Sequence, residues 1–135
     1  MVGSLIPSSR FLAKKMLQHI PFDSAKVIVE LGPGTGIFTE KIMAKLAPDT
    51  HLIVIELNDV FYHKLAEKAQ HPNCHMVHGS ASDLKKILHD LGFEKADCIV
   101  SSLPLANFPK DLRIDIMEAV TNCLTPTGTF IQFQY

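Results

Sequence analysis

The chain has 135 residues, of which 47% are hydrophobic, and this is enough for one domain with a sizeable core. Thirteen basic and fourteen acidic side chains leave a net charge of -1, which makes a nucleic-acid partner less favoured. No apolar run reaches the roughly 18 to 20 residues that span a bilayer, and the N-terminus lacks the pattern of a secretory signal peptide. We therefore expect a cytoplasmic protein whose three cysteines are reduced and structural.

The first predicted element is a helix over Ser8–His19. It carries an apolar stripe beside three basic residues: Phe11, Leu12, Met16, Leu17 and Ile20 with Arg10, Lys14 and Lys15. Two interpretations stay open. Residues 8–20 can lie on an anionic membrane surface, which would place the protein peripherally at the inner face of the membrane. Alternatively, this is an ordinary helix that covers the mouth of a site and leaves its lysines solvated.

A predicted strand, Lys26–Leu31, is followed by three glycines within five positions. Its apolar run, broken only by Glu30, is typical of a strand buried on both faces of a parallel sheet. A fixed glycine costs roughly 0.5 to 1 kcal/mol relative to alanine, so three together indicate a backbone that closely approaches another group, either a ligand or, in a tight turn without a ligand, the protein itself. A helix predicted over Gly36–Leu46 would point its first N–H groups into the crevice at the end of the strand.

The second predicted strand, His51–Glu56, ends on an acidic residue twenty positions after Gly36. In a doubly wound fold, a carboxylate at that place accepts hydrogen bonds from a ribose diol. The glycine spacing at Gly32, Gly34 and Gly36 is G-x-G-x-G and differs from the dinucleotide fingerprint G-x-G-x-x-G. The pattern therefore predicts a ligand that contains a nucleoside and is not NAD.

Strands and helices continue to alternate along the rest of the chain. The remaining predicted strands are Cys74–His78, Ala96–Ser101 and Thr129–Tyr135, and the remaining helices are Asp59–Gln70, Asp83–Asp90 and Lys110–Leu124. A turn at residues 125–128 separates the last helix from the last strand. This order predicts an α/β fold: a Rossmann-like, doubly wound parallel sheet of about five strands, in the order 3-2-1-4-5, with helices on both faces.

The motifs ELGPGTG, at residues 30–36, and IELN, at residues 55–58, resemble the first two motifs of the class I S-adenosylmethionine-dependent methyltransferases. The resemblance implies that residues 1–135 form one domain that binds S-adenosyl-L-methionine. It also implies a domain shorter than the family's full domain, without the last strands of its seven-stranded sheet. The implied cofactor-binding residues are Glu30, Gly32, Pro33, Gly34, Thr35, Gly36, Glu56, Leu57, Ser80, Ala81 and Ser101.

In that family the glycine turn lies against the methionine moiety, the counterpart of Glu30 contacts its amino-acid end, and the counterpart of Glu56 holds the ribose hydroxyls. The third motif of the family typically reads G-D-A. Here Ser80 stands at the usual position of the aspartate, within GSASD. Three partners for the adenine stay open: Ser80, Asp83 or the backbone of this loop.

The fourth strand ends in CIVSSLPLANFP, which bears on the methyl acceptor. Methyltransferases of nucleobase amines commonly read [DNS]-[PIL]-P-[YFW] here, and the aromatic residue stacks on an extruded base. Leu105 occupies that position, so such a base would lose a stacking contact worth about 1 to 3 kcal/mol. This weakens the resemblance to ribosomal-RNA adenine dimethyltransferases that ELGPGTG suggests.

Four segments together look like the bacterial phospholipid N-methyltransferases: GSLIPSSRFLAKKM, ELGPGTGIFT, SSLPLANFP and TFIQFQY. The resemblance implies methyl transfer to the amine of a phospholipid such as phosphatidylethanolamine. We expect Ser101, Ser102, Leu103 and Pro104 to orient the amine, with proton loss to water. The alternatives are an RNA (rRNA adenine-N6) or small-molecule methyltransferase, and a cofactor-binding domain without activity.

The segment HPNCHMVH gathers histidines but does not have the spacing of a metal site. His75 and His78 are three positions apart, which places them on opposite faces of a strand, so we expect no metal.

The last predicted strand alternates Ile131, Phe133 and Tyr135 with Gln132 and Gln134. An apolar edge strand with open N–H and C=O groups tends to pair with another chain. We therefore expect either a homodimer through this edge or a marginal fragment of a longer protein.

Overall fold

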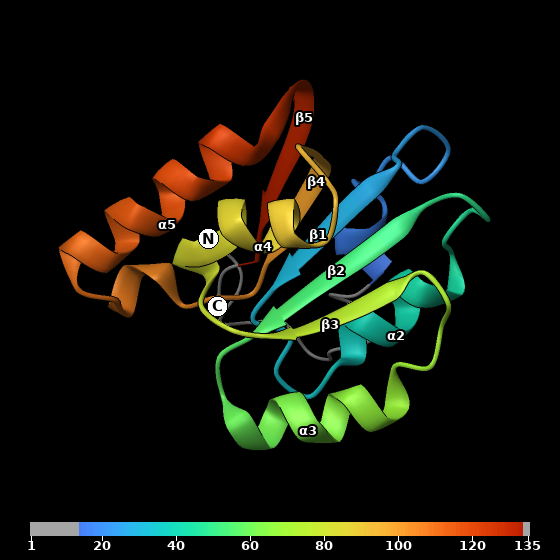
Figure 1. Ribbon diagram of the computed structural model, residues 1–135, viewed down its shortest axis with the longest axis horizontal. Coiled ribbons are helices and arrows are strands. Elements are labelled where there is room, and N and C mark those ends of the chain that lie inside the picture. The colour runs from blue at the N-terminus through green and yellow to red at the C-terminus, as the bar shows by residue number, and fades with distance from the viewer. Residues whose placement is uncertain (1–13, 134–135) are drawn as a thin grey trace.

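The computed structural model describes residues 14–133, which form a five-stranded sheet with helices on both faces (Figure 1). The sheet order is β3-β2-β1-β4-β5, and each neighbouring pair is parallel. The predicted fold class and strand order are therefore confirmed. The strands are β1 (Val27–Leu31), β2 (His51–Glu56), β3 (Cys74–His78), β4 (Ala96–Ser101) and β5 (Leu124–Gln132).

The helices lie in two layers, with α2 and α3 on one face of the sheet and α4 and α5 on the other (Figure 1). Their bounds are α2 (Ile37–Ala44), α3 (Asp59–Lys68), α4 (Leu84–Asp90) and α5 (Lys110–Cys123). Two short 3-10 turns, η2 (Ala81–Asp83) and η3 (Leu105–Asn107), precede α4 and α5. Residues 14–17 are also helical.

The central strand β1 separates two hydrophobic clusters. Val29 and Leu31 belong to the cluster with α4 and α5, whereas Ile28 belongs to the cluster with α2. Successive side chains of a strand point to opposite faces, so one apolar run supplies both layers. Every residue of β1 is buried, as its sequence predicted.

The described part of the N-terminal helix packs on the α2 layer. Met16 and Ile20 are buried in the cluster that contains Phe38, whereas Lys14 and Lys15 are exposed. These residues thus pack on the sheet and leave both lysines at the surface. Membrane contact stays a prediction, and the predicted start of the helix lies outside the described residues. Within residues 14–133, no helix has the length and apolar character needed to cross a membrane.

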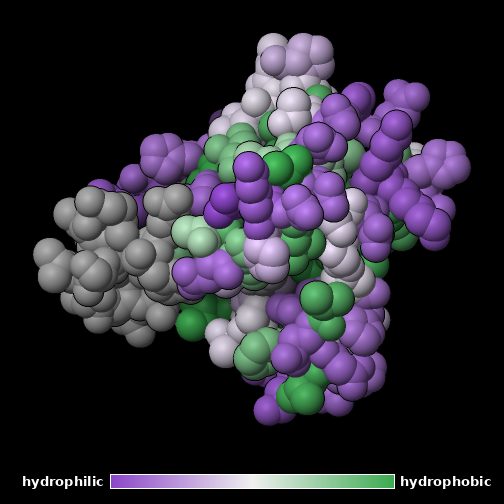
Figure 2. Space-filling view, turned by 90° about the vertical axis from the view of Figure 1, so that its left-hand side faces the viewer, coloured by the Kyte–Doolittle hydropathy of each residue, from purple (hydrophilic) through white to green (hydrophobic). Residues whose placement is uncertain are grey.

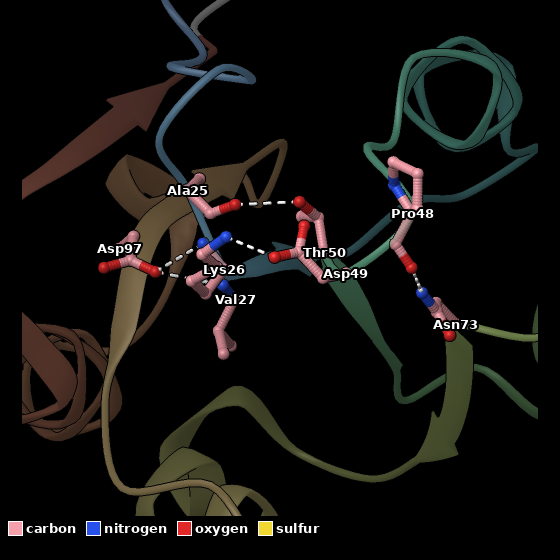
Figure 3. A network of polar contacts seen from close by, with 8 residues as sticks. All are labelled: Ala25, Lys26, Val27, Pro48, Asp49, Thr50, Asn73 and Asp97. Atoms are coloured by element: carbon pink, nitrogen blue, oxygen red, sulfur yellow. Dashed lines mark hydrogen bonds and ion pairs between the residues drawn. The ribbon is translucent and has the colours of Figure 1, made fainter.

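The amino ends of the strands are tied together by polar side chains (Figure 3). The Asp97 carboxylate accepts hydrogen bonds from the backbone N–H groups of Lys26, at 2.8 Å, and Val27, at 3.0 Å. The Lys26 ammonium pairs with Asp49 in turn. Asn73 Nδ2 donates to the Pro48 carbonyl oxygen at 2.8 Å, and Thr50 Oγ1 donates to the Ala25 carbonyl oxygen at 2.8 Å. These contacts hold the amino ends of strands β1 to β4 together.

Strand β5 begins earlier than the sequence predicted. Leu124 pairs with Ala96 directly after α5, and the register then moves to Cys98 opposite Thr129. The irregular register falls on the predicted turn at residues 125–128, where the chain folds back tightly: a Cβ atom on Gly128 would lie 3.1 Å from the Thr125 carbonyl oxygen. Pro126 lies between the paired residues Leu124 and Thr129, where the regular ladder has no position that needs its missing N–H.

The end of β5 packs against the α2 layer. Phe133 is buried, and its ring centroid lies 5.4 Å from that of Phe38. Ile131 is half-buried against the same cluster. Dimerisation through this edge stays a prediction, and Gln134 and Tyr135 lie outside the described residues.

The histidines of β3 lie on opposite faces, as predicted. His75 stacks on His51, with Nε2 and Nδ1 3.0 Å apart, whereas His78 stacks on Tyr62 of α3. Burial, with a smaller effect from His51, lowers the pKa of His75. In the part of the chain that the structure describes, no three His, Cys, Asp or Glu side chains gather as metal ligands do.

The three cysteines are free thiols inside the fold, with Cys98 and Cys123 buried and Cys74 half-buried. Burial raises the pKa of Cys98 to about 12 and that of Cys74 to about 11, so both thiols stay protonated and unreactive near neutral pH. Seen from the side of α5, hydrophilic residues cover much of the surface, and hydrophobic residues show between them in small groups (Figure 2).

Candidate functional site

The glycine turn after β1 has a left-handed backbone at Gly32, Gly34 and Gly36, with φ of 67°, 59° and 87°. A Cβ atom on Gly32 would lie 2.5 Å from Leu103 Cδ2, and one on Gly36 would lie 2.4 Å from Leu65 Cδ1. No atom lies within 4 Å of the corresponding position at Gly34. Packing thus requires the outer two glycines, whereas the middle one borders open space that a ligand can enter.

One hydrogen bond ties the turn to strand β2, and a second closes the turn internally. The Gly32 N–H donates to the Ile55 carbonyl oxygen at 3.0 Å, and the Gly36 N–H donates to that of Pro33 at 3.0 Å. Pro33 is buried and Thr35 is exposed. Helix α2 starts directly after Gly36, so its first N–H groups lie at the carboxyl edge of the sheet, as predicted.

Glu56, at the end of β2, joins two loops. Its Oε1 accepts from the Gly34 N–H at 3.0 Å, and its Oε2 accepts from the Asn58 N–H at 2.9 Å. Only 7% of Glu56 is exposed, whereas the neighbouring Leu57 is 68% exposed. A carboxylate has about four acceptor positions, so each oxygen can also accept a hydroxyl donor from a ligand.

Glu30 is completely buried under α2 and is only half satisfied. Its Oε1 accepts from Thr39 Oγ1, whereas its Oε2 has no hydrogen-bond partner among the described residues. Burial raises the pKa of Glu30 to about 7; the hydrogen bond from Thr39 opposes this rise, and the charge of Glu56 adds to it. An unpaired buried carboxyl oxygen near the carboxyl edge of the sheet is suited to a donor group of a ligand.

The loop after β3 approaches the same edge. The Gly79 N–H donates to the Glu56 carbonyl oxygen at 3.1 Å. Ser80 Oγ accepts from the Ser82 N–H at 3.2 Å, and buried Ala81 begins η2. Asp83 is exposed. Ser80 is thus engaged as a helix cap, and the three candidate partners for an adenine stay open.

The segment after β4 is held by its own serines. Ser101 is buried, and its Oγ accepts from the Leu103 N–H at 3.2 Å. The Ser102 N–H donates to the Leu31 carbonyl oxygen at 3.0 Å, which ties this loop to β1. Ser102 Oγ is buried without a hydrogen-bond partner among residues 14–133, and Pro104 is exposed.

A cavity of about 210 Å³ lies at the carboxyl ends of β4 and β5. It is lined by Leu103, Pro104, Leu105, Ala106, Asn107, Gln132 and Phe133, which include no histidine and no carboxylate. Gln132 Nε2 donates to the carbonyl oxygens of Leu103 and Phe133, both at 2.8 Å. Our sequence analysis did not identify Gln132 as a site residue. The sheet order is the signal that could have found it, because Gln132 pairs with Ser101 in the neighbouring strand.

The structure therefore brings the two predicted groups of residues to one edge of the sheet. Glu30, the glycine turn and Glu56 lie on the side of β1 and β2, whereas the serines of the β4 loop lie on the other side. Leu103 joins the two groups, because its side chain packs on Gly32. This edge, where the strand order reverses direction, is the usual ligand site of open α/β sheets. The arrangement can hold a nucleoside ligand beside a second molecule.

Comparison with known proteins identifies a family and a relative. Residues 28–128 match the family model described as a methyltransferase domain. The chain is 42% identical over 132 residues to the ornithine lipid N-methyltransferase of Singulisphaera acidiphila, covering 97% of this chain and 69% of that protein.

Two solved structures share the fold. One is the O-methyltransferase of tomaymycin synthesis from Streptomyces achromogenes, solved in complex with SAM, with a TM-score of 0.71 and 19% identity. The other is a methyltransferase from Listeria monocytogenes described as putative and S-adenosylmethionine-dependent, with a TM-score of 0.68 and 20% identity. Each alignment covers 93% of this chain, which spans 56% and 55% of the two solved chains respectively.

Proposed function

The chain belongs to the class I S-adenosylmethionine-dependent methyltransferases, and from this premise we propose that it methylates the amine of a membrane lipid. The observation that carries the proposal is the 42% identity to a lipid N-methyltransferase along nearly the whole chain. The name of that relative specifies ornithine lipid, and the four segments noted above resemble enzymes that methylate phosphatidylethanolamine. We propose a lipid amine such as that of phosphatidylethanolamine as the acceptor.

The residues at the carboxyl edge fit the cofactor. The unpaired Glu30 Oε2 suits its amino group, the open side of Gly34 leaves room for it, and the Glu56 carboxylate suits its ribose diol. When bound, S-adenosylmethionine supplies a methyl group that is already activated for transfer. The protein therefore mainly has to align the acceptor with this methyl group.

The loop after β4 is proposed to align the amine. Ser101 and Gln132 fix the backbone of Leu103, and Ser102 offers an unpaired hydroxyl next to it. The cavity lining contains no side chain suited to act as a base near neutral pH, so the proton of the amine leaves to water.

Leu105 supports a lipid over an RNA acceptor. It is half-buried and packs against the α4 and α5 cluster, so this position offers no aromatic platform for a base. Methylation of RNA or of a small molecule, and a domain that binds the cofactor without activity, are the alternatives.

The proposal is tested with S-adenosylmethionine carrying a labelled methyl group. We expect label in phosphatidylethanolamine or ornithine lipid presented in vesicles, and none in an adenine-containing RNA. Label in RNA alone would contradict the proposal, and tight cofactor binding without transfer to any acceptor would favour the inactive alternative.

Gly34→Ala is expected to weaken binding of S-adenosylhomocysteine about tenfold or more, because its Cβ would enter the open space beside the turn. The strained backbone should also lower the free energy of unfolding by about 1 kcal/mol. Gly92→Ala is a matched control, since Gly92 has a φ of 90° and equally open surroundings. Calorimetry and chemical denaturation should show similar stability losses but a binding loss at Gly34 alone. Equal binding by both variants would place the ligand elsewhere.

Membrane contact through residues 8–20 is a further part of the proposal. Because Met16 and Ile20 are buried, the described residues can contribute charge at a membrane surface through Lys14 and Lys15. Each cation contributes about 1 kcal/mol near an anionic surface. Replacing both by glutamine should therefore reduce binding to anionic vesicles about 30-fold in a flotation assay.

A control for this experiment is the pair Lys85→Gln and Lys86→Gln on α4, which lies on the opposite face of the sheet. The control protein should float like the unmodified protein. Equal flotation of all three proteins would exclude Lys14 and Lys15 from the membrane contact.

A further inference from the structure

The side-chain amide of Gln132 has a fixed orientation. Its Nε2 carries two N–H groups, and these donate to the carbonyl oxygens of Leu103 and Phe133 at 2.8 Å each. Rotating the amide by 180° would set Oε1 against two carbonyl oxygens. The oxygen must therefore stay on the other side, where it is buried and has no hydrogen-bond partner among the described residues.

Gln132 lies close to the cofactor side of the site without belonging to it. It lines the 210 Å³ cavity, and its partner Leu103 packs against Gly32 of the glycine turn. Gln132 is thus separated from the turn by a single residue. Ser102 Oγ, one residue before Leu103, is a second buried polar atom without a partner in the described part of the chain.

An acceptor atom that is shielded from water and unpaired is unfavourable, and most such atoms in folded proteins have a partner. A ligand that brings an N–H group to Gln132 Oε1 relieves this cost, whereas a ligand without one leaves it in place. Sites with a buried hydrogen-bonding group therefore discriminate strongly against analogues that lack the complementary group.

We propose that Gln132 Oε1 accepts a hydrogen bond from the N–H of the acceptor amine and thereby selects head groups that still carry an N–H. The inference rests on the proposed function and adds a specificity-determining residue to it. Primary and monomethylated ammonium groups keep an N–H donor even after they lose one proton to water, whereas a dimethylated ammonium group donates its single N–H on binding and gives up that proton before attack. A trimethylated nitrogen has none, so the fully methylated product binds weakly and leaves.

The alternative is that Gln132 only ties the end of β5 to the β4 loop. The two roles differ in their dependence on the ligand. A structural tie affects all head groups equally, whereas an acceptor atom affects them according to their N–H content.

The experiment measures binding of short-chain dihexanoyl phosphatidylethanolamine and of its mono-, di- and trimethylated forms in the presence of S-adenosylhomocysteine. With the unmodified protein, we expect the largest loss of affinity, about tenfold, between the dimethyl and trimethyl forms. In the Gln132→Leu protein, the affinities for the dimethyl and trimethyl forms should differ by less than about twofold. Gln70→Leu is the matched control, because Gln70 also donates to two carbonyl oxygens but lies on the exposed surface at the end of α3.

An even decline of affinity across the methylated series of the unmodified protein would overturn the inference without any variant. An unchanged step in a Gln132→Leu protein that still binds S-adenosylhomocysteine within twofold of the unmodified protein would overturn it as well. Methyl transfer measured with the same lipids separates the two proposals. Methyl transfer without the loss of affinity between the dimethyl and trimethyl lipids refutes the role of Gln132 alone. That loss of affinity without methyl transfer refutes the proposed function alone.

Discussion

Replacing Glu56 by alanine should weaken binding of S-adenosylmethionine about tenfold or more. The carboxylate is predicted to accept two hydrogen bonds from the ribose diol, and a hydrogen bond to a charged group is worth about 1.5 to 3 kcal/mol. The same substitution removes the acceptor of the Gly34 and Asn58 N–H groups. It should therefore also loosen the glycine turn and lower the free energy of unfolding by about 1 to 3 kcal/mol.

Calorimetry below the unfolding temperature of the variant separates the two effects. Glu67→Ala on the exposed side of α3 removes a carboxylate without touching the site and should bind like the unmodified protein. Neither protein should bind NAD. An unchanged dissociation constant for Glu56→Ala, or tight binding of NAD, would show that Glu56 does not contact a ribose.

Glu30→Gln is expected to have an effect on stability that depends strongly on pH. The pKa of Glu30 is raised from its ordinary value of 4.5 to about 7, chiefly by burial. The folded protein thus holds a proton that the unfolded chain has released between these two pH values. The resulting stabilisation is fully present below pH 4.5 and is lost as the pH rises through 7.

A pKa difference of this size corresponds to about 3 kcal/mol. The glutamine variant lacks the titration, so its stability relative to the unmodified protein should rise by about 3 kcal/mol between pH 4.5 and pH 8. Urea denaturation at several pH values measures this difference. The titration of His75 is common to both proteins and cancels in the comparison. A pH-independent difference would mean that Glu30 is ionised in the free protein throughout this range.

Local sequence patterns predicted most of the fold because they coincide with the final packing. The apolar run of β1 is buried on both faces, and the glycines with positive φ follow it directly. Glu56 could be identified because an acidic residue at the end of a buried run is unusual. In each case the signal lies within a few residues of the feature that it predicts.

The features that were missed depend on residues far apart in the chain. Leu124 pairs with Ala96 before the turn at residues 125–128, so β5 begins five positions earlier than the predicted start at Thr129. Local turn propensity cannot report this register. Gln132 of β5 lies in the site because its side chain donates a hydrogen bond to Leu103, in the loop after β4 and 29 positions earlier in the sequence. A lone glutamine in an alternating strand gives no local sign of that contact.

The tight segment at residues 125–128 of β5 has a practical consequence for labelling the protein. Pro126 and Thr127 are exposed, stand outside the regular ladder and lie near the amino end of the strand, away from the carboxyl edge that carries the site. A flexible insertion at this point should lower the free energy of unfolding only slightly, because doubling the length of a loop adds only about 0.6 kcal/mol to the entropic cost of closing it. A short tag or a fluorophore-bearing peptide inserted between these residues should therefore leave the loops at the carboxyl edge intact.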